Sequence, residues 1–261
     1  MLSGEFIEIM GPALLAGLMV ALVHVPLGME VLARGIVFID LAIAQIAGLC
    51  VVLVNYWVHE PSWGTVQFAV ATAALCAAVL FRWVERTVPR EQEAIIGSSF
   101  ILAASAMLLA LVDNPHAGEE ISHILAGQIL FVRWSTVAAF SPIFVVAFVL
   151  WFAVPLVRRG LPFFILFALV VTASVQLVGV YVVFASLILP ALAVNTLRSN
   201  GTVVAVFISI CAVLAGIAVS TWADLPAGPA LVFAFAISAV SVRFTHRVFL
   251  ARGREFTSPK Q

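Results

Sequence analysis

Long runs without a charged residue alternate with short charged segments along the whole chain. The runs are at residues 9–29, 41–58, 61–81, 94–112, 134–157, 160–197, 199–223 and 225–242. A helix needs about 20 apolar residues to cross the roughly 30 Å hydrocarbon core of a bilayer. Every run except 160–197 has about this length, so each of the others predicts one transmembrane helix.

The run 160–197 is too long for one transmembrane helix. Gly179 lies near its middle and Pro190 near its end, and both residues interrupt regular helices. We therefore expect a broken or re-entrant helix pair over 161–197. The sequence predicts an all-α, polytopic membrane helix bundle of about nine transmembrane segments. We expect it to form a single domain over residues 1–251, followed by a disordered cytoplasmic tail over 252–261.

The composition agrees with a bundle that is surrounded by lipid. Hydrophobic residues make up 64% of the chain and charged residues 10%, and the mean hydropathy is +1.18. Soluble domains carry roughly 25% charged residues, so this chain cannot cover a water-facing surface. The formal net charge is zero, and no basic patch indicates nucleic acid as a partner.

The arginines set the orientation of the bundle. They cluster after the third run (Arg82, Arg86 and Arg90), after the fifth (Arg158 and Arg159), at position 198 and in the C-terminal tail. Short cytoplasmic loops carry an excess of Lys and Arg. Nine segments place all these groups on the cytoplasmic side, with the N-terminus outside and the C-terminus inside, whereas eight segments would divide them between the two sides.

One segment between the predicted spans has chemical content of its own. Residues 113–133 read DNPHAGEEISHILAGQILFVR and fall on the outer side. The start of the segment is too polar to span a membrane. Its second half predicts a short interfacial or re-entrant helix.

Asp40 is the first candidate for a functional residue. It lies in RGIVFIDLAIAQIAG, after a break at Pro26–Gly28 and before a helix that carries Gln45. Ionisable groups in or beside membrane spans are costly and usually functional. A carboxylate at a helix N-terminus also stabilises the helix dipole. The sequence therefore leaves two interpretations open, a cation pathway or a structural cap.

The second candidate is the acidic and histidine-rich part of the segment 113–133. Glu119 and Glu120 precede His123 at i,i+4 and i,i+3 spacing, so one helical face can present carboxylate and imidazole together. His116 can join them from the preceding loop. These donors suit Zn²⁺, Mn²⁺ or Fe²⁺. A solvated outer loop is the alternative, because this spacing is frequent by chance.

The chain shows no signature of an enzyme. It contains no hydrolase triad, no phosphate-binding loop and no HExxH motif. Any energy from ATP must therefore come from a partner. An intramembrane metalloenzyme built on Glu120 and His123 remains a third possibility, although no general base accompanies those ligands.

Four blocks of the sequence resemble one known family. They are LGMEVLARGIVFIDLAIAQIAG, PREQEAIIG, GEEISHILAGQILFV, and the stretch from LVGVYVVFASLILPALAV to WADLPAGPALV. In this order they are similar to the permease subunits of bacterial ABC transporters for zinc, manganese and iron(II). The last block is the most specific, and the four together cover most of the chain.

The resemblance implies a transporter subunit in the bacterial inner membrane. Two copies would form the pore, a cytoplasmic ATPase dimer would dock on them, and a periplasmic binding protein would deliver the metal. The divalent ion would be the substrate, with no tightly bound cofactor. By the same resemblance, Asp40 belongs to the metal site. Gln45 occupies the place where many relatives have histidine, so Glu120 and His123 are expected to supply the missing charge and nitrogen.

The sequence departs from the family in one loop. Relatives usually have a cytoplasmic coupling helix between the fifth and sixth spans, whereas here VPLVRRGLPFF leaves no room for one. Coupling through the loop 82–93 is one expectation, and a passive metal channel or an orphan modulatory subunit is the alternative. The residues that we consider for contact with an ATPase are Arg82, Glu85, Arg86, Arg90, Glu91, Arg158 and Arg159.

Overall fold

The structure is a computed structural model that describes residues 2–112, 114, 117–127, 129–197 and 200–257, some of them by their backbone alone. In this part of the chain every regular element is helical. The α-helices are α1 (Leu2–Arg34), α2 (Ile39–Trp57), α3 (Trp63–Thr87), α4 (Gln92–Ala110), α5 (Ala117–Ala126), α6 (Trp134–Ala153), α7 (Gly160–Val178), α8 (Val180–Val194), α9 (Gly201–Ala223) and α10 (Ala227–Thr257). Two single 3-10 turns are η1 (Ile129–Phe131) and η2 (Pro155–Arg158).

The helices confirm the predicted membrane bundle. Among the described residues, 8 helices are long and apolar enough to cross a membrane, and α8 is a shorter apolar helix. With its 15 residues, α8 rises only about 22 Å, which is less than the hydrocarbon thickness. The long apolar run is thus divided into a full span and a short helix, as its length predicts.

Gly179 makes the break between α7 and α8. Its φ of +81° lies in the region that glycine adopts without strain. Its N–H caps α7 by donating to the carbonyl oxygen of Val175 at 2.9 Å, and its carbonyl accepts from Val183 at 3.1 Å. The two helices therefore meet without a loop, and the backbone of Gly127, after α5, packs directly against the junction.

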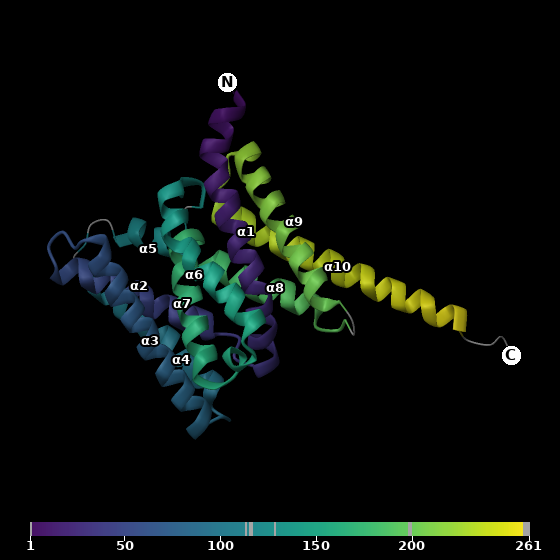
Figure 1. The fold of residues 1–261 in the computed structure, drawn as a ribbon, viewed down its shortest axis with the longest axis horizontal. Coiled ribbons are helices and arrows are strands. Elements are labelled where there is room, and N and C mark those ends of the chain that lie inside the picture. The colour runs from purple at the N-terminus through teal and green to yellow at the C-terminus, as the bar shows by residue number, and fades with distance from the viewer. Residues whose placement is uncertain (1, 113, 115–116, 128, 198–199, 258–261) are drawn as a thin grey trace.

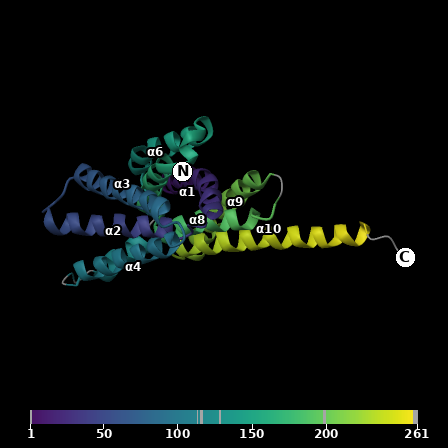
Figure 2. The same ribbon diagram turned by 90° about the horizontal axis from the view of Figure 1, so that it is seen from below.

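The helices form two flanking groups around a central one (Figures 1 and 2). Helices α2, α3 and α4 lie on one side, and α9 and α10 on the other. Between them lie α1, α7 and α8, with α1 packed on α8 and α9, and α7 on α3. The C-terminal part of α10 extends away from the body of the molecule.

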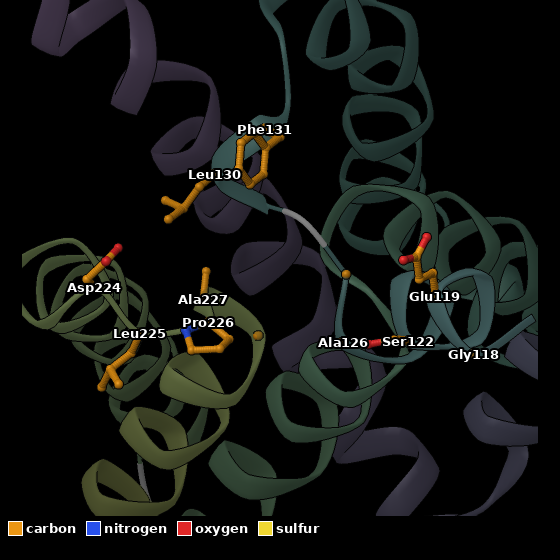
Figure 3. Close-up of a pocket in the computed structure, with 12 residues that line it drawn as sticks. Gly118, Glu119, Ser122, Ala126, Leu130, Phe131, Asp224, Leu225, Pro226 and Ala227 are labelled. Carbon is orange, nitrogen blue, oxygen red and sulfur yellow. The ribbon is translucent and has the colours of Figure 1, made fainter. Parts of the chain in front are cut away.

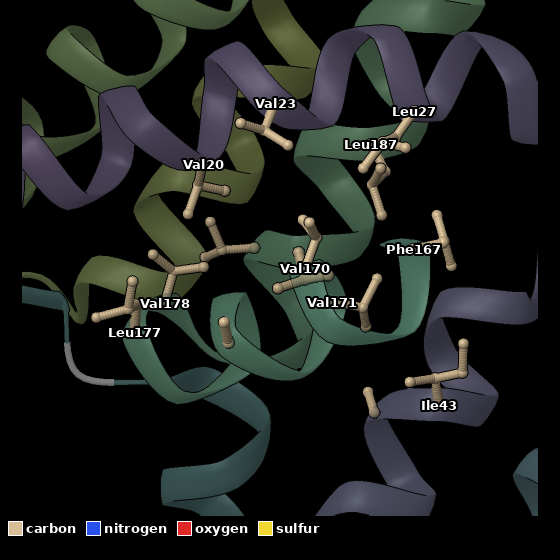
Figure 4. Close-up of a cluster of buried hydrophobic side chains, with 14 of the residues drawn as sticks. Val20, Val23, Leu27, Ile43, Phe167, Val170, Val171, Leu177, Val178 and Leu187 are labelled. Atoms are coloured by element: carbon tan, nitrogen blue, oxygen red, sulfur yellow. The ribbon is translucent and has the colours of Figure 1, made fainter. Parts of the chain in front are cut away.

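The apolar core lies where α1 crosses the two central helices. Val20, Val23 and Leu27 of α1 face Val170 of α7 and Leu187 of α8 (Figure 4). Below them, Phe167 and Val171 extend the contact towards Ile43 of α2. Because these side chains are almost fully buried, the central helices form one packed unit on which the flanking helices rest.

Two expected boundaries need correction. In the segment 113–133 the helix α5 occupies Ala117–Ala126, earlier than expected, and only η1 follows it. The acidic pair in its first turn favours a helix start there, because carboxylates stabilise a helix N-terminus. The fifth span ends at Ala153 rather than 157, since Pro155 has no N–H to continue α6 and instead begins η2.

The division into a domain over 1–251 and a tail over 252–261 stays a prediction. The helix α10 continues to Thr257, and residues 258–261 lie outside the described part of the chain. No side chain beyond Thr245 is described.

Candidate functional site

Asp40 lies in the first turn of α2 and is 1% exposed. Neither carboxylate oxygen has a hydrogen-bond partner in the described part of the protein. The residue at the cap position is Phe38, and no side chain of α2 caps the helix. Asp40 therefore does not act as a hydrogen-bonding cap, although its carboxylate lies at the positive end of the α2 helix dipole. A buried carboxylate without a partner is the arrangement expected of a group that binds a cation.

Glu93 caps α2 from the neighbouring helix α4. Its Oε1 accepts the N–H of Phe38 at 3.2 Å, two residues before Asp40. Its second oxygen, Oε2, is buried and has no partner among the described residues. Glu93 lies in the first turn of α4, so the helix that it caps is not its own. The start of α2 thus has two carboxyl groups, that of Asp40 in its own first turn and that of Glu93 from α4.

Gln45 faces a different part of the bundle from Asp40. Positions i and i+5 are about 140° apart on a helix, and Gln45 lines a large apolar cavity of about 810 Å³ together with Leu41. Side chains of α4, α5, α8 and α10 form the other walls of this cavity. The side-chain oxygen of Gln45 is buried without a partner among the described residues. Asp40 and Gln45 therefore do not form a simple pair of ligands.

The segment that carries the predicted histidines lies beside a later part of α2 than the turn that carries Asp40. Ile124 of α5 packs on Gly48, which is about 12 Å along the helix axis from Asp40 at 1.5 Å per residue. The structure therefore places Asp40 and α5 at different levels and does not bring them together. Glu120 and His123 lie in α5, as their spacing predicts, but their side chains are outside the described part. His116 is outside the described residues altogether.

Glu119 lies beside a second cavity, at the end of the bundle where α5 and α10 begin (Figure 3). The cavity has a volume of about 600 Å³. Glu119 and Asp224 lie on opposite sides of it, with Leu130 and Phe131 above. Both carboxylates are exposed. This cavity is open to solvent, and the negative charge of its two carboxylates attracts cations.

The part of α5 below this opening is held in place by close backbone contacts. A Cβ on Gly228 would lie 2.0 Å from the carbonyl oxygen of Ala126, and one on Gly127 would lie 2.3 Å from that of Val178. Only glycine permits so close an approach at both positions. The end of α5 is therefore fixed between the α7–α8 junction and the start of α10.

His24 of α1 forms the most extensive buried polar contact of the central helices. Its Nδ1 lies 2.7 Å from Oγ of Ser186 on α8, and its Nε2 lies 2.8 Å from Oγ of Ser174 on α7. The ring is fully buried. Both ring nitrogens are thus engaged by protein groups, so in this conformation His24 has no lone pair free for a metal. Its position joins α1 to the two helices on either side of Gly179.

The serines around His24 test whether this contact is structural. We expect Ser174→Ala or Ser186→Ala to destabilise the protein by about 1–2 kcal/mol, because each leaves one buried ring nitrogen without a partner. The triple variant with His24→Leu should recover most of the loss, since no buried polar group then remains unpaired. Thermal unfolding of the purified variants measures this effect. A folded triple variant that has lost the activity of the protein would contradict a purely structural role.

The residues proposed for ATPase contact lie at the end of the bundle next to Asp40. Arg34, at the end of α1, pairs with Glu85 of α3 at 3.1 Å, and Glu85 also pairs with Arg82. Arg158 donates two hydrogen bonds to the carbonyl oxygen of Trp151, at 3.0 and 2.8 Å. We call this end, where α1, α3 and η2 terminate, the arginine end.

The other four predicted contact residues are exposed. Arg86 lies in the last turn of α3, Arg90 and Glu91 precede α4, and Arg159 lies between η2 and α7. Between α6 and α7 the chain has only the single turn η2. The prediction that this connection has no room for a coupling α-helix is confirmed.

Three important residues are not among the candidates that the sequence indicated. They are Arg34, Glu93 and His24. Each acts through a partner on another helix, often more than fifty positions away in sequence. The available signal was the cost of a charged or polar group within an apolar run, which indicates that a partner exists but not which one.

The fold is that of a polytopic integral membrane protein, with a buried carboxylate that has no hydrogen-bond partner among the described residues. The ABC 3 transport family matches residues 6–159 and 153–245, nearly the whole chain, and the protein belongs to this family. It is therefore the permease subunit of an ABC transporter. The two matched segments meet at the connection between α6 and α7.

A solved structure shows the same fold. PsaBC from Streptococcus pneumoniae, in complex with Fab, is similar with a TM-score of 0.72 and 16% sequence identity, over 93% of this chain and 95% of that chain. At this identity the similarity shows the fold alone. No curated protein matches the chain.

Proposed function

We propose that this permease moves a divalent transition metal ion inward, and that Asp40 is the carboxylate that binds the ion on its way. The buried, unpaired carboxylate of Asp40 is the observation that carries the proposal. Carboxylate oxygens bind Zn²⁺, Mn²⁺ and Fe²⁺. Two further oxygens that are buried without a partner among the described residues are Oε2 of Glu93 on α4 and Oε1 of Gln45 on α2.

The charges at the two ends of the bundle support inward transport. The arginine end would face the cytoplasm by the positive-inside rule, with the N-terminus outside and the C-terminus inside. The opposite end has Glu119 and Asp224 around an open cavity. A metal ion delivered by a periplasmic binding protein would meet this negative charge first, and His116, Glu120 and His123 remain predicted ligands on its path.

The proposal includes two partners in the membrane complex, an ATPase and a second copy of the permease. It has no ATP-binding motif, so a cytoplasmic ATPase dimer would supply the energy at the arginine end. A second copy of the permease would complete the pore. The large cavity with Gln45 is bounded by α2, α4, α8 and α10, and a facing copy would close it.

The test is ATP-driven uptake by the complete transporter in vesicles. The vesicles contain the permease and its ATPase, with ATP inside, and the binding protein presents ⁵⁴Mn or ⁶⁵Zn from outside. We expect these vesicles to accumulate the metal ion. Competition among Mn²⁺, Zn²⁺ and Fe²⁺ then identifies the preferred ion. Uptake that continues without ATP, or that Asp40→Ala leaves unchanged, would refute the proposal.

One observation favours a second candidate, a passive metal channel or an orphan modulatory subunit. The connection between α6 and α7 is a single 3-10 turn, and the family match is divided at that point. A chain without a coupling helix is not expected to respond to ATP hydrolysis. Metal flux that runs down its gradient at the same rate with and without ATP would support this candidate, whereas a stable complex with an ATPase would count against it.

A further inference from the structure

Arg34 makes more contacts than any other arginine in the described part of the protein. Its Nε pairs with Glu30 one turn earlier at 2.8 Å, and its Nη1 with Glu85 of α3 at 3.1 Å. Its Nη2 donates to the backbone carbonyl of Arg158 in η2 at 2.7 Å. The guanidinium also lies 4.0 Å from the centre of the Phe163 ring of α7. One side chain thus joins α1, α3, η2 and α7.

These contacts use the specific shape of arginine. The planar guanidinium presents its donors in a fixed fork and stacks on aromatic faces, which lysine cannot reproduce. The side chain of Arg34 is only 18% exposed. An arginine that merely extended to the lipid headgroups would direct its charge to solvent, so simple interfacial anchoring does not explain this geometry.

The connection η2 is held from both sides. Arg34 bonds to the carbonyl oxygen of Arg158, while the guanidinium of Arg158 bonds to the carbonyl oxygen of Trp151 in α6. A short connection fixed in this way cannot move independently of its neighbours. A force on η2 or on the end of α3 is therefore passed to Arg34.

Arg34 is also coupled mechanically to Asp40. The turn 35–38 joins Arg34 to α2 and is hydrogen-bonded to both helices. The N–H of Ile36 donates to the carbonyl oxygen of Val31 at 3.3 Å, and the N–H of Ile39 donates to the carbonyl oxygen of Ile36 at 3.2 Å. Ile36 and Ile39 are buried. Glu93 of α4 holds the same turn through Phe38. A shift of Arg34 must therefore displace the first turn of α2, which carries Asp40.

We propose that Arg34 is a positioning residue that transmits movement of the ATPase-facing end to Asp40, in place of the longer coupling segment of the family. This inference rests on the proposed function. Glu85 at the end of α3 and the backbone of Arg158 in η2 receive the movement. Arg34 combines both inputs, and the turn 35–38 delivers them to the metal-binding carboxylate.

The experiment compares Arg34→Lys and Glu85→Gln with the unchanged transporter. Permease and ATPase are reconstituted together in vesicles, and ⁵⁴Mn uptake and ATP hydrolysis are measured in the same preparation. We expect the number of ions moved per ATP to fall about fivefold or more, the lower end of typical coupling between distant sites. For Arg34→Lys, the ATPase rate and the metal concentration for half-maximal uptake should stay near those of the unchanged protein. Arg34→Lys keeps the charge, so it tests the fork geometry rather than the net charge.

A matched control separates coupling from general stability. Arg243 of α10 also donates to a backbone carbonyl, that of Leu192, at 2.7 Å, but it does not contact the turn 35–38. Arg243→Lys should leave the ratio of transport to hydrolysis unchanged. If Arg34→Lys lowers transport and hydrolysis in proportion, or changes neither, the inference is wrong while the proposed function stands. No ATP-driven uptake by the unchanged protein would instead overturn the proposed function and this inference with it.

Discussion

Asp40→Asn is expected to abolish ATP-driven metal uptake and at the same time to raise the thermal stability of the protein. The carboxylate is buried and unpaired, so the folded state bears the free-energy cost of removing it from water. Asparagine has nearly the same shape without the charge, which should stabilise the fold by about 1 kcal/mol or more. Uptake should fall more than the roughly 10–100-fold seen when a residue only supports a metal ligand.

The two opposite effects distinguish a functional carboxylate from a structural one. If Asp40 supported the start of α2, the substitution would lower stability and uptake together. Thermal unfolding of the purified protein and ⁶⁵Zn or ⁵⁴Mn uptake by vesicles measure the two effects separately. For the stability measurement, Asp224→Asn is the matched control. Asp224 is exposed, and its φ of 52° is one that asparagine adopts readily, so its stability should change by less than about 0.5 kcal/mol.

Most of the helices could be predicted from the sequence, because each depends on the length and composition of one continuous stretch of residues. Charge-free runs of span length predicted the membrane helices, and Gly179 predicted the junction between α7 and α8. The family resemblance carried by four sequence blocks is confirmed by the match over nearly the whole chain. The bounds of α5 were less accurate, since its apolar residues are too few to distinguish a helix over 117–126 from one further along.

The surroundings of the candidate site depend on which helices pack together, and the sequence does not record this. Asp40 was found because a carboxylate in an apolar run is unusual by itself. Its distance from α5 and the cap provided by Glu93 depend on how α2 packs against α4 and α5. The contacts of Arg34 with Glu85 and with η2 likewise join segments that are far apart in the chain. A sequence of such uniform apolar character contains few signals that choose between alternative packings.

Gly28→Ala is expected to disrupt the contact between α1 and α8 and to destabilise the fold by about 3 kcal/mol or more, at the upper end for overpacked cores. A Cβ on Gly28 would lie 2.0 Å from the carbonyl oxygen of Leu187 and 2.8 Å from its carbonyl carbon. These are backbone atoms of a helix, so no side-chain rotation can relieve the overlap and the two helices must separate. Thermal unfolding of the purified variant measures the loss.

Gly97→Ala is the same chemical change, but it is not expected to lower the stability of the protein. Gly97 lies inside α4, and no atom lies within 4 Å of the position that a Cβ would occupy. Alanine favours a helix by about 1 kcal/mol over glycine, so this variant should be as stable as the unchanged protein or more so. Because the helix preference contributes equally at both positions, the difference between the two variants measures the packing of α1 on α8 alone. Equal effects at positions 28 and 97 would show that the two helices can separate at little cost, and that His24 and the serines, rather than the close backbone contact, hold the central helices together.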